Sequence, residues 1–195
     1  MAEALARARS PVTTSDGGCE YLTRNYNTKT SKHLQEIHDQ WANQFDDDIA
    51  RQDYVAPQYV AQAILDNLGK IDGDILDAGC GTGCPNIDGN DLSTGMLKVA
   101  AKTGLYKCLA PADLSKPIKK ADNTYDVVTC VRTLTHSHEF IRLTKPGGLV
   151  VATVIDDVWT TYGYEAEVKR LQDTGLAEIL SFESKAYRQN AGVYA

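Results

Sequence analysis

The spacing of apolar residues along the chain separates a leader from a folded region. Residues 1 to 30 are rich in Ala, Arg, Ser, Thr and Gly with little apolar periodicity, which is typical of a mobile leader. From residue 31 onward, apolar side chains recur at helical spacing, first at Leu34, Ile37, Trp41 and Phe45. The pattern therefore predicts a leader over residues 1 to 30 and one folded domain over residues 31 to 195.

A second helix is predicted after Pro57 and before Gly69, which is a typical helix stop. Its apolar face comprises Val60, Ala63, Ile64 and Leu68. Two helices therefore precede the first predicted strand.

Short apolar stretches alternate with helical spacing through the rest of the chain. The predicted strands cover residues 73 to 79, 86 to 92, 106 to 110, 125 to 131 and 149 to 155. A helix is predicted to begin after the capping residue Ser93 and to end at Gly104. Its inward face comprises Met96, Leu97, Ala100 and Ala101. Shorter helices are expected at residues 139 to 143 and 165 to 174, and a final antiparallel strand pair at residues 176 to 184 and 192 to 195. Such alternation predicts an α/β fold with a doubly wound, mostly parallel, Rossmann-like sheet.

Composition narrows the classes of protein and partner. The chain is 43% hydrophobic and 24% charged, as in ordinary globular proteins, and its apolar run at residues 149 to 155 is far too short to span a membrane. The net charge is −6 and the basic residues are scattered, which favours a small-molecule or protein substrate over nucleic acid. Five cysteines without CxxC spacing predict reduced thiols and a cytoplasmic or nuclear protein, while Glu3 argues against mitochondrial import.

A glycine-rich turn follows the first predicted strand. Glycines at positions 79, 81 and 83 let the backbone turn sharply and let a ligand approach it closely, although such a triplet also occurs in ordinary turns. Three carboxylates follow the ends of successive strands: Asp77, Asp91 and Asp113. In this order they can orient an ammonium, accept from ribose hydroxyls and accept from an adenine amino group, respectively.

Each carboxylate also has a purely structural interpretation. Asp91 can cap the helix that begins near Ser93, and Asp113 can be a solvated turn residue. A dinucleotide-binding site fits less well, because Pro85 follows the glycines and no helix of useful length begins there to receive a pyrophosphate.

The motifs ILDAGCGTG, IDGNDLSTGML, CLAPADL, NTYDVVTCV and LTKPGGLVV, in this order, resemble class I S-adenosylmethionine-dependent methyltransferases. The block HDQWANQFDDD, with Tyr54 and Pro57, resembles the methyltransferase-like protein 27 group within that family. The resemblance covers residues 31 to 194 and implies S-adenosylmethionine as cofactor, a strand order of 3-2-1-4-5-7-6, and methyl transfer to an acceptor that the sequence does not identify. The cofactor-binding residues that it implies are Asp77, Gly79, Gly81, Asp91, Met96, Asp113 and Leu114, with Trp41 and Tyr54 covering the cofactor.

Catalytic residues are less well defined. His136 and His138 follow the fourth strand and are weak candidate bases, since surface-loop histidines are the simpler interpretation. The resemblance alone places Arg132, Thr133 and Leu134 near the reactive end of the cofactor. No third ligand accompanies the two histidines, so no metal site is expected, and both Cys80 and Cys84 are interpreted as small packing residues.

The sequence departs from the family where the first two strands are joined. Parallel neighbours need a crossover of about a dozen residues, generally a helix, and only Cys84 and Pro85 separate Gly83 from the next predicted strand. The interval from residue 132 to 148 is also short.

Two hypotheses follow: a shortened but active methyltransferase, or a degenerate relative that binds little cofactor. A third hypothesis is an interaction module that uses the N-terminal helices and Trp41 as a partner surface. The alternative for Trp41 is ordinary packing at helical spacing. The acidic run at residues 46 to 48 is expected to be a solvated helix end.

Overall fold

A five-stranded parallel sheet in the order β3-β2-β1-β4-β5 forms the centre of the molecule. The computed structural model describes residues 19–70, 73–83, 87–131, 137–155, 159 and 163–186. The strands are β1 (Ile75–Ala78), β2 (Asp88–Asp91), β3 (Cys108–Pro111), β4 (Tyr125–Val131) and β5 (Thr144–Thr153). The predicted α/β fold and the first five positions of its strand order are therefore confirmed.

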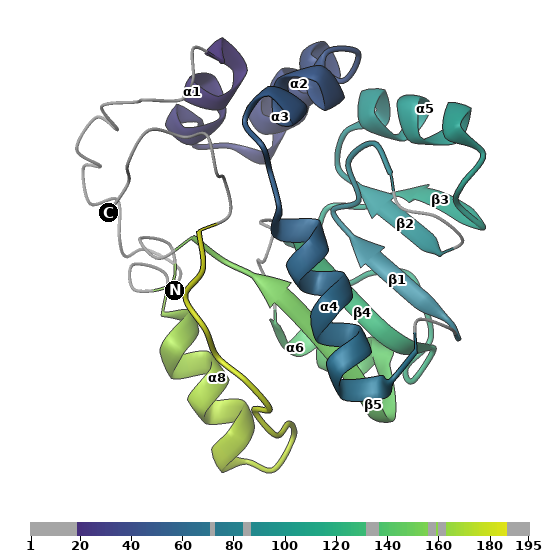
Figure 1. Ribbon diagram of the computed structural model, residues 1–195, viewed down its shortest axis with the longest axis vertical. Coiled ribbons are helices and arrows are strands. Elements are labelled where there is room, and N and C mark those ends of the chain that lie inside the picture. The colour runs from purple at the N-terminus through teal and green to yellow at the C-terminus, as the bar shows by residue number, and fades with distance from the viewer. Residues whose placement is uncertain are drawn as a thin grey trace.

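Helices cover both faces and one edge of this sheet. They are α1 (Glu20–Asn27), α2 (Ser31–Trp41), α3 (Phe45–Arg51), α4 (Ala56–Leu68), α5 (Thr94–Thr103), α6 (Ser137–Leu143) and α8 (Tyr164–Asp173). In Figure 1, α4 crosses the front of the sheet, α6 lies behind it, and α1, α2 and α3 lie beyond the carboxyl ends of the strands. Within the described residues, no helix combines the length and apolar character needed to cross a membrane. The arrangement leaves the N-terminal helices directly above the loops that leave β1 and β2.

Local signals in the sequence fix the ends of these helices. The α4 helix carries Pro57 in its first turn and ends at Gly69, whose φ of +69° lies in the left-handed region that glycine favours. At the start of α5, the Ser93 hydroxyl accepts a hydrogen bond from the backbone N–H of Met96 at 3.0 Å. Met96 and Ala100 of this helix are buried as predicted, whereas Ala101 is exposed, so its predicted inward orientation is wrong.

The N-terminal region contains more structure than its composition indicates. Two helices were expected before β1, and the described residues from 19 to 70 form four. The α1 helix lies inside the predicted leader, yet its Leu22 is only 2% exposed and packs in one cluster with Trp41 and Met96. The boundary at residue 30 is therefore wrong for α1, because Leu22 and the neighbouring Tyr21 pack this helix against Trp41.

The C-terminal half also differs from expectation. Strand β5 begins at Thr144, but its pairing with β4 shifts register and becomes regular only from Leu149, the predicted start. Residues 176–186 contain no strand, so the first half of the predicted antiparallel pair is not formed. Its second half, residues 192 to 195, lies outside the described residues. The described sheet therefore ends at β5.

The connection between β1 and β2 has no room for a crossover helix. Residues 79–87 join the two parallel strands, and the described residues among them form only turns and bends. The return is sterically feasible because each strand has only 4 residues, and an extended chain spans about 3.3 Å per residue. The short connection predicted from the sequence is therefore long enough to join these two strands as parallel neighbours.

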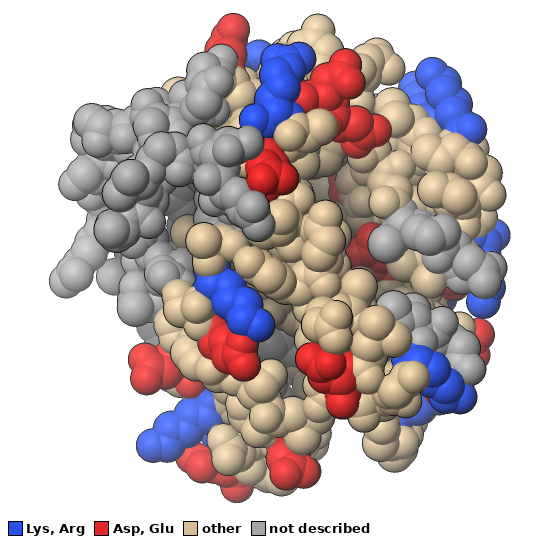
Figure 2. Space-filling model, in the orientation of Figure 1, with Lys and Arg blue, Asp and Glu red and all other residues tan. Residues whose placement is uncertain are grey.

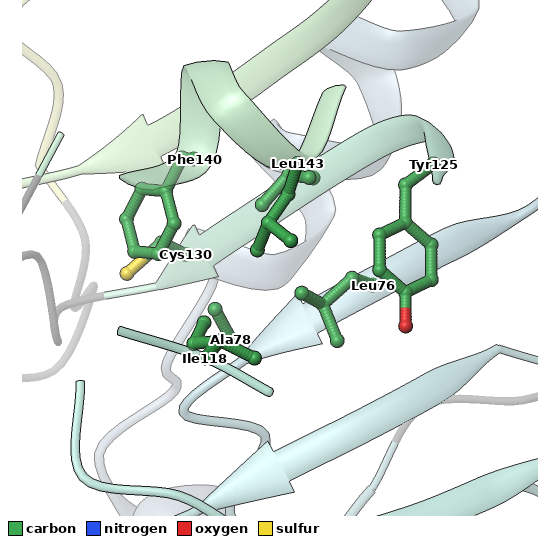
Figure 3. Close-up of a cluster of buried hydrophobic side chains, with 8 residues drawn as sticks. Leu76, Ala78, Ile118, Tyr125, Cys130, Phe140 and Leu143 are labelled. Carbon is green, nitrogen blue, oxygen red and sulfur yellow. The ribbon is translucent and has the colours of Figure 1, made fainter. Parts of the chain in front are cut away.

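Buried side chains fill the space between the sheet and α6. Figure 3 shows Leu76 and Ala78 from β1 facing Phe140 and Leu143 from α6, with Tyr125 at one end of the group. Leu76 is 1% exposed. Close packing of this kind makes the loss of even one side chain costly.

Truncation of Leu76 tests how strongly this core stabilises the fold. Leu76→Ala leaves a cavity between the sheet and α6 and should lower the free energy of unfolding by about 2–5 kcal/mol. Leu65→Ala is a matched control, because Leu65 lies on α4 and is 40% exposed. Urea unfolding checks both variants. A cost at Leu76 no larger than at Leu65 would contradict this description of the core.

Candidate functional site

The glycine-rich turn after β1 is held to the end of β2 by backbone hydrogen bonds. Gly79 and Gly81 have φ of +79° and +55°, a conformation that side chains disfavour. The N–H groups of Gly79 and Cys80 both donate to the carbonyl oxygen of Asn90 at 2.8 Å. The turn therefore has a defined position relative to β2.

Asp91 at the end of β2 links the turn to α5. Its Oδ2 accepts from the Gly81 N–H at 2.9 Å, and its Oδ1 accepts from the Ser93 N–H at 2.7 Å. The side chain is buried, and burial raises its pKa even though both hydrogen bonds lower it. The contact with Ser93 thus agrees with the interpretation of Asp91 as a helix cap. The contact with Gly81 shows that Asp91 also shapes the turn.

Asp77 lies one strand away, at the end of β1. Thr129 donates its hydroxyl to Oδ1 at 3.1 Å, and Tyr106 donates its hydroxyl to Oδ2 at 3.3 Å. Burial raises the pKa of Asp77 to about 6, the two hydrogen bonds lower it, and the like charge of Asp91 raises it. Two buried carboxylates therefore flank the turn, as the sequence predicted.

Asp39 is a third acidic residue at this edge, and it was not among the residues expected here. It lies on α2, and its Oδ1 accepts from the Ser93 hydroxyl at 2.6 Å and from the Gly95 N–H at 2.7 Å. A Cβ at Gly95 would lie 2.8 Å from the Cα of Asp39, so glycine is needed for α2 to approach α5 this closely. Gly95, a glycine in the first turn of a predicted helix, was the feature of the sequence that could have indicated this close approach.

The acidic run at residues 46 to 48 lies in the first turn of α3, and two of its residues also contact neighbouring elements. The Thr82 hydroxyl in the turn donates to Asp46 Oδ1. The Trp41 Nε1–H donates to Asp48 Oδ2 at 2.7 Å. Asp46 and Asp47 are exposed, which agrees with the predicted solvated helix end, whereas Asp48 is half-buried against Trp41 and departs from it.

Trp41 and Met96 pack together beneath these contacts. Both are only 1% exposed, and the Trp41 ring lies 5.7 Å from the ring of Tyr21 and 4.8 Å from that of Phe45, centroid to centroid. Burial rules out the hypothesis that Trp41 forms a partner surface. Instead, Trp41 supports the helices that cover the turn, where Phe45 lies 3.8 Å from the Cβ position of Gly81. Tyr54 is half-buried just before α4.

Asp113 lies after β3, apart from the two buried carboxylates. Its Oδ1 accepts from the Ser115 N–H at 3.0 Å and from the Ser115 hydroxyl at 2.6 Å, and Lys116 lies 2.9 Å from Oδ2. These contacts lower its pKa. The structure thus shows the turn-forming role that was the alternative for Asp113, and a contact with adenine stays a prediction. Leu114 packs against the core between the sheet and α6.

The candidate base His138 is exposed in the first turn of α6. His136, together with Arg132, Thr133, Leu134 and Cys84, lies outside the described residues. In the described part of the chain, no group of three His, Cys, Asp or Glu side chains could hold a metal. Cys80 is buried beside Asp77 and Asp91, and burial raises the pKa of its thiol, which disfavours the nucleophilic thiolate.

Comparison with known proteins gives one clear relative by sequence. No family model matches the chain. Human methyltransferase-like protein 27 is 30% identical over 166 residues, which cover 74% of this chain and 68% of the human protein.

Solved structures resemble the fold. A protein from Thermotoga maritima described as an S-adenosylmethionine-dependent methyltransferase, possible histamine N-methyltransferase, matches with a TM-score of 0.50 and 17% identity over 70% of this chain and 69% of that one. The cyclase SpnF matches with a TM-score of 0.50 and 20% identity over 64% of this chain, which spans 60% of the cyclase. At these identities the likeness concerns the fold.

Ionisation of Asp77 gives the site a testable dependence on pH. Its pKa of about 6 in the folded protein exceeds the ordinary 3.8, so the folded state binds more protons between these values and stability falls as pH rises through them. Asp77→Asn removes this titration. The free energy of unfolding of the variant, relative to that of the unmodified chain, should therefore increase by on the order of 2 to 3 kcal/mol from pH 4 to pH 7.

Urea unfolding at intervals of half a pH unit measures this difference. Asp126→Asn is the control, because contacts with the Asp74 N–H and with Lys145 lower the pKa of Asp126. The free energy of unfolding of Asp126→Asn, relative to that of the unmodified chain, should therefore decrease as the pH rises. A constant difference between Asp77→Asn and the unmodified chain would show that Asp77 titrates normally.

Proposed function

Because this chain belongs to the class I S-adenosylmethionine-dependent methyltransferases, as a relative of human methyltransferase-like protein 27, we propose that it binds S-adenosylmethionine at residues 77–96 and transfers the methyl group to an acceptor. The observation that carries this proposal is the pair of buried carboxylates, Asp77 and Asp91, on either side of the glycine turn. The fold alone would not suffice, since one fold hosts many reactions.

The charges of the site fit a cationic ligand. Within the described structure, every hydrogen bond to Asp77 and Asp91 comes from a neutral donor: Thr129, Tyr106, Gly81 or Ser93. Burial without a bonded cation is unfavourable for a carboxylate. A ligand that brings an ammonium and a sulfonium would offset this cost, and hydroxyl groups of a ribose could use the remaining lone pairs of Asp91.

Five groups of residues would hold the cofactor under this proposal. Asp77 would receive the ammonium, and Gly79 and Gly81 would allow close approach to the backbone. Asp91 would receive the ribose, Asp113 and Leu114 would lie near the adenine, and Met96, Trp41 and Tyr54 would support and cover it. The contacts of Met96 with Trp41 in one buried cluster support a role beneath the cofactor rather than free movement of either side chain.

The chemistry needs little from the protein beyond alignment. The bound cofactor supplies a methyl group on a positively charged sulfur, which is already activated for displacement. The residues of the chain orient the reactants and exclude water, as the layer formed by Phe45 and the Asp46–Thr82 hydrogen bond would do above the turn. Where the acceptor must lose a proton, His138 and His136 are the proposed bases.

The acceptor is proposed to be a small molecule or a protein. Figure 2 shows acidic and basic side chains interspersed over one face of the molecule, without a concentrated basic area. This distribution and the net charge of −6 do not favour a nucleic-acid backbone. We also propose a cytoplasmic location, on the basis of the five cysteines without paired spacing.

A second candidate function is ligand binding without methyl transfer. The short connection between β1 and β2 favours it, because a helix that begins after the glycine turn would present N–H groups to the ligand. The two functions share the carboxylates and differ in turnover.

Calorimetric titration with S-adenosylmethionine and S-adenosylhomocysteine tests the proposal. We expect both ligands to bind, and we expect Asp91→Ala to lose at least about tenfold in affinity, which corresponds to about 1.4 kcal/mol. Asp77→Asn should weaken S-adenosylmethionine similarly without removing hydrogen bonds to the turn. Asp126→Asn is the matched control, because Asp126 lies near the start of β4, at the end of the sheet away from the glycine turn. The affinity of this variant for both ligands should be unchanged.

Circular dichroism of each variant separates loss of binding from loss of folding. A folded chain that gives no heat with either ligand would refute the proposal. Binding without transfer to any small-molecule or protein acceptor would favour the second function.

A further inference from the structure

The short β1–β2 connection leaves part of the sheet without a helix above it. The side chain that occupies this place is Tyr106, from the loop between α5 and β3. A Cβ at Gly89, in the middle of β2, would lie 2.6 Å from Tyr106 Cε1 and 2.9 Å from Cys80 Sγ. The ring therefore lies directly on β2, at a position where only glycine leaves enough room.

The loop that carries Tyr106 is fixed on both sides of the ring. The Lys107 N–H donates to the carbonyl oxygen of Ile87 at 2.9 Å, immediately before β2. On the other side, the ring edge lies 3.7 Å from the Cβ position of Gly83, at the end of the glycine turn. Tyr106 thus bridges the two ends of the shortened connection.

The hydroxyl of this ring reaches the proposed cofactor-binding carboxylate. It donates to Asp77 Oδ2 at 3.3 Å, while Thr129 donates to the other oxygen. Asp77 is thereby held from two elements, the loop before β3 and strand β4. A carboxylate held by two donors keeps a defined orientation toward a ligand.

We infer that Tyr106 is a positioning residue for the cofactor: its ring covers β2 in place of a crossover helix, and its hydroxyl orients Asp77 toward the cofactor's ammonium. This inference rests on the proposed function and assigns to Tyr106 a role that the glycine turn and the carboxylates do not perform. Tyr106 acts through Asp77 and is not itself a catalytic residue.

The hydroxyl also controls the ionisation of Asp77. The groups that act on this carboxylate are the like charge of Asp91, from β2, and the hydrogen bonds from Thr129 and Tyr106, while burial raises its pKa to about 6. The neighbouring Cys80 thiol has a raised pKa and stays neutral. Loss of the Tyr106 hydrogen bond should therefore raise the pKa of Asp77 further.

Tyr106→Phe tests the inference, because it removes the hydroxyl and retains the ring. A pKa of Asp77 above about 6 lowers its ionised fraction near pH 6.5, whereas at pH 8.5 the carboxyl remains ionised in both forms. The affinity for S-adenosylmethionine should follow, with a loss of about threefold at pH 6.5 and little loss at pH 8.5. Calorimetry across this range gives the affinities, and carbon-13 NMR of the Asp77 carboxyl gives its pKa directly.

Tyr125→Phe is the matched control. Tyr125 is also buried, and its hydroxyl donates to a carboxylate, Asp88 Oδ2, at 2.9 Å. This variant loses the same type of hydrogen bond away from the glycine turn, and its binding profile should keep the midpoint of the unmodified chain. A uniform loss of affinity at all pH values in Tyr106→Phe would indicate a purely structural role and would overturn the inference.

The outcomes also separate this inference from the proposed function. If the unmodified chain binds normally and Tyr106→Phe has the same midpoint and the same Asp77 pKa, the inference alone is overturned. If the unmodified chain is folded but binds no S-adenosylmethionine at any pH, the proposed function fails, and the positioning role fails with it.

Discussion

The hydrogen bonds between the glycine turn and the end of β2 are the contacts on which the site depends. Among the described residues between β1 and β2 no helix fixes the direction of the turn. Its position is set by Asn90, which accepts from two of its N–H groups, and by Asp91, which accepts from a third. Asp91 extends the same link to α5 through Ser93, and Asp39 continues it to α2. A chain of short polar contacts thus joins the sheet, the turn and the covering helices.

This arrangement concentrates carboxylates where their charge is least stable. Asp77 and Asp91 are buried close enough for each to raise the other's cost of ionisation, and Asp39 adds a further negative charge that acts on Asp91. His38 provides some compensation at Asp91. Such sites store unfavourable electrostatic energy that a cationic ligand can release, which is why strongly shifted pKa values are frequent at functional sites.

The sequence predicted the sheet well because its signals are local. Gly69, Ser93 and Gly104 end or begin helices through their own backbone conformations and side-chain bonds, and the positions of Asp77 and Asp91 at strand ends followed from the strands themselves. Contacts between distant segments were not predictable. The α1 helix depends on the packing of Leu22 and Tyr21 against Trp41, and Asp46 gains its contact because α3 packs against Thr82.

Tyr106 illustrates the same limit and also how the fold compensates for a short connection. It lies 29 positions from Asp77, in a segment whose apolar pattern indicates only a strand and its preceding loop. What gives it a role is the close approach permitted by Gly89. A crossover helix would supply N–H groups suited to an anion, whereas a tyrosine ring supplies apolar cover and a single donor. The site that results retains the carboxylates that select for positive charge and, in the described residues, lacks a helix N-terminus after the turn that would select for negative charge. Recognition should therefore depend on the cationic groups and the ribose of the cofactor more than on its carboxylate.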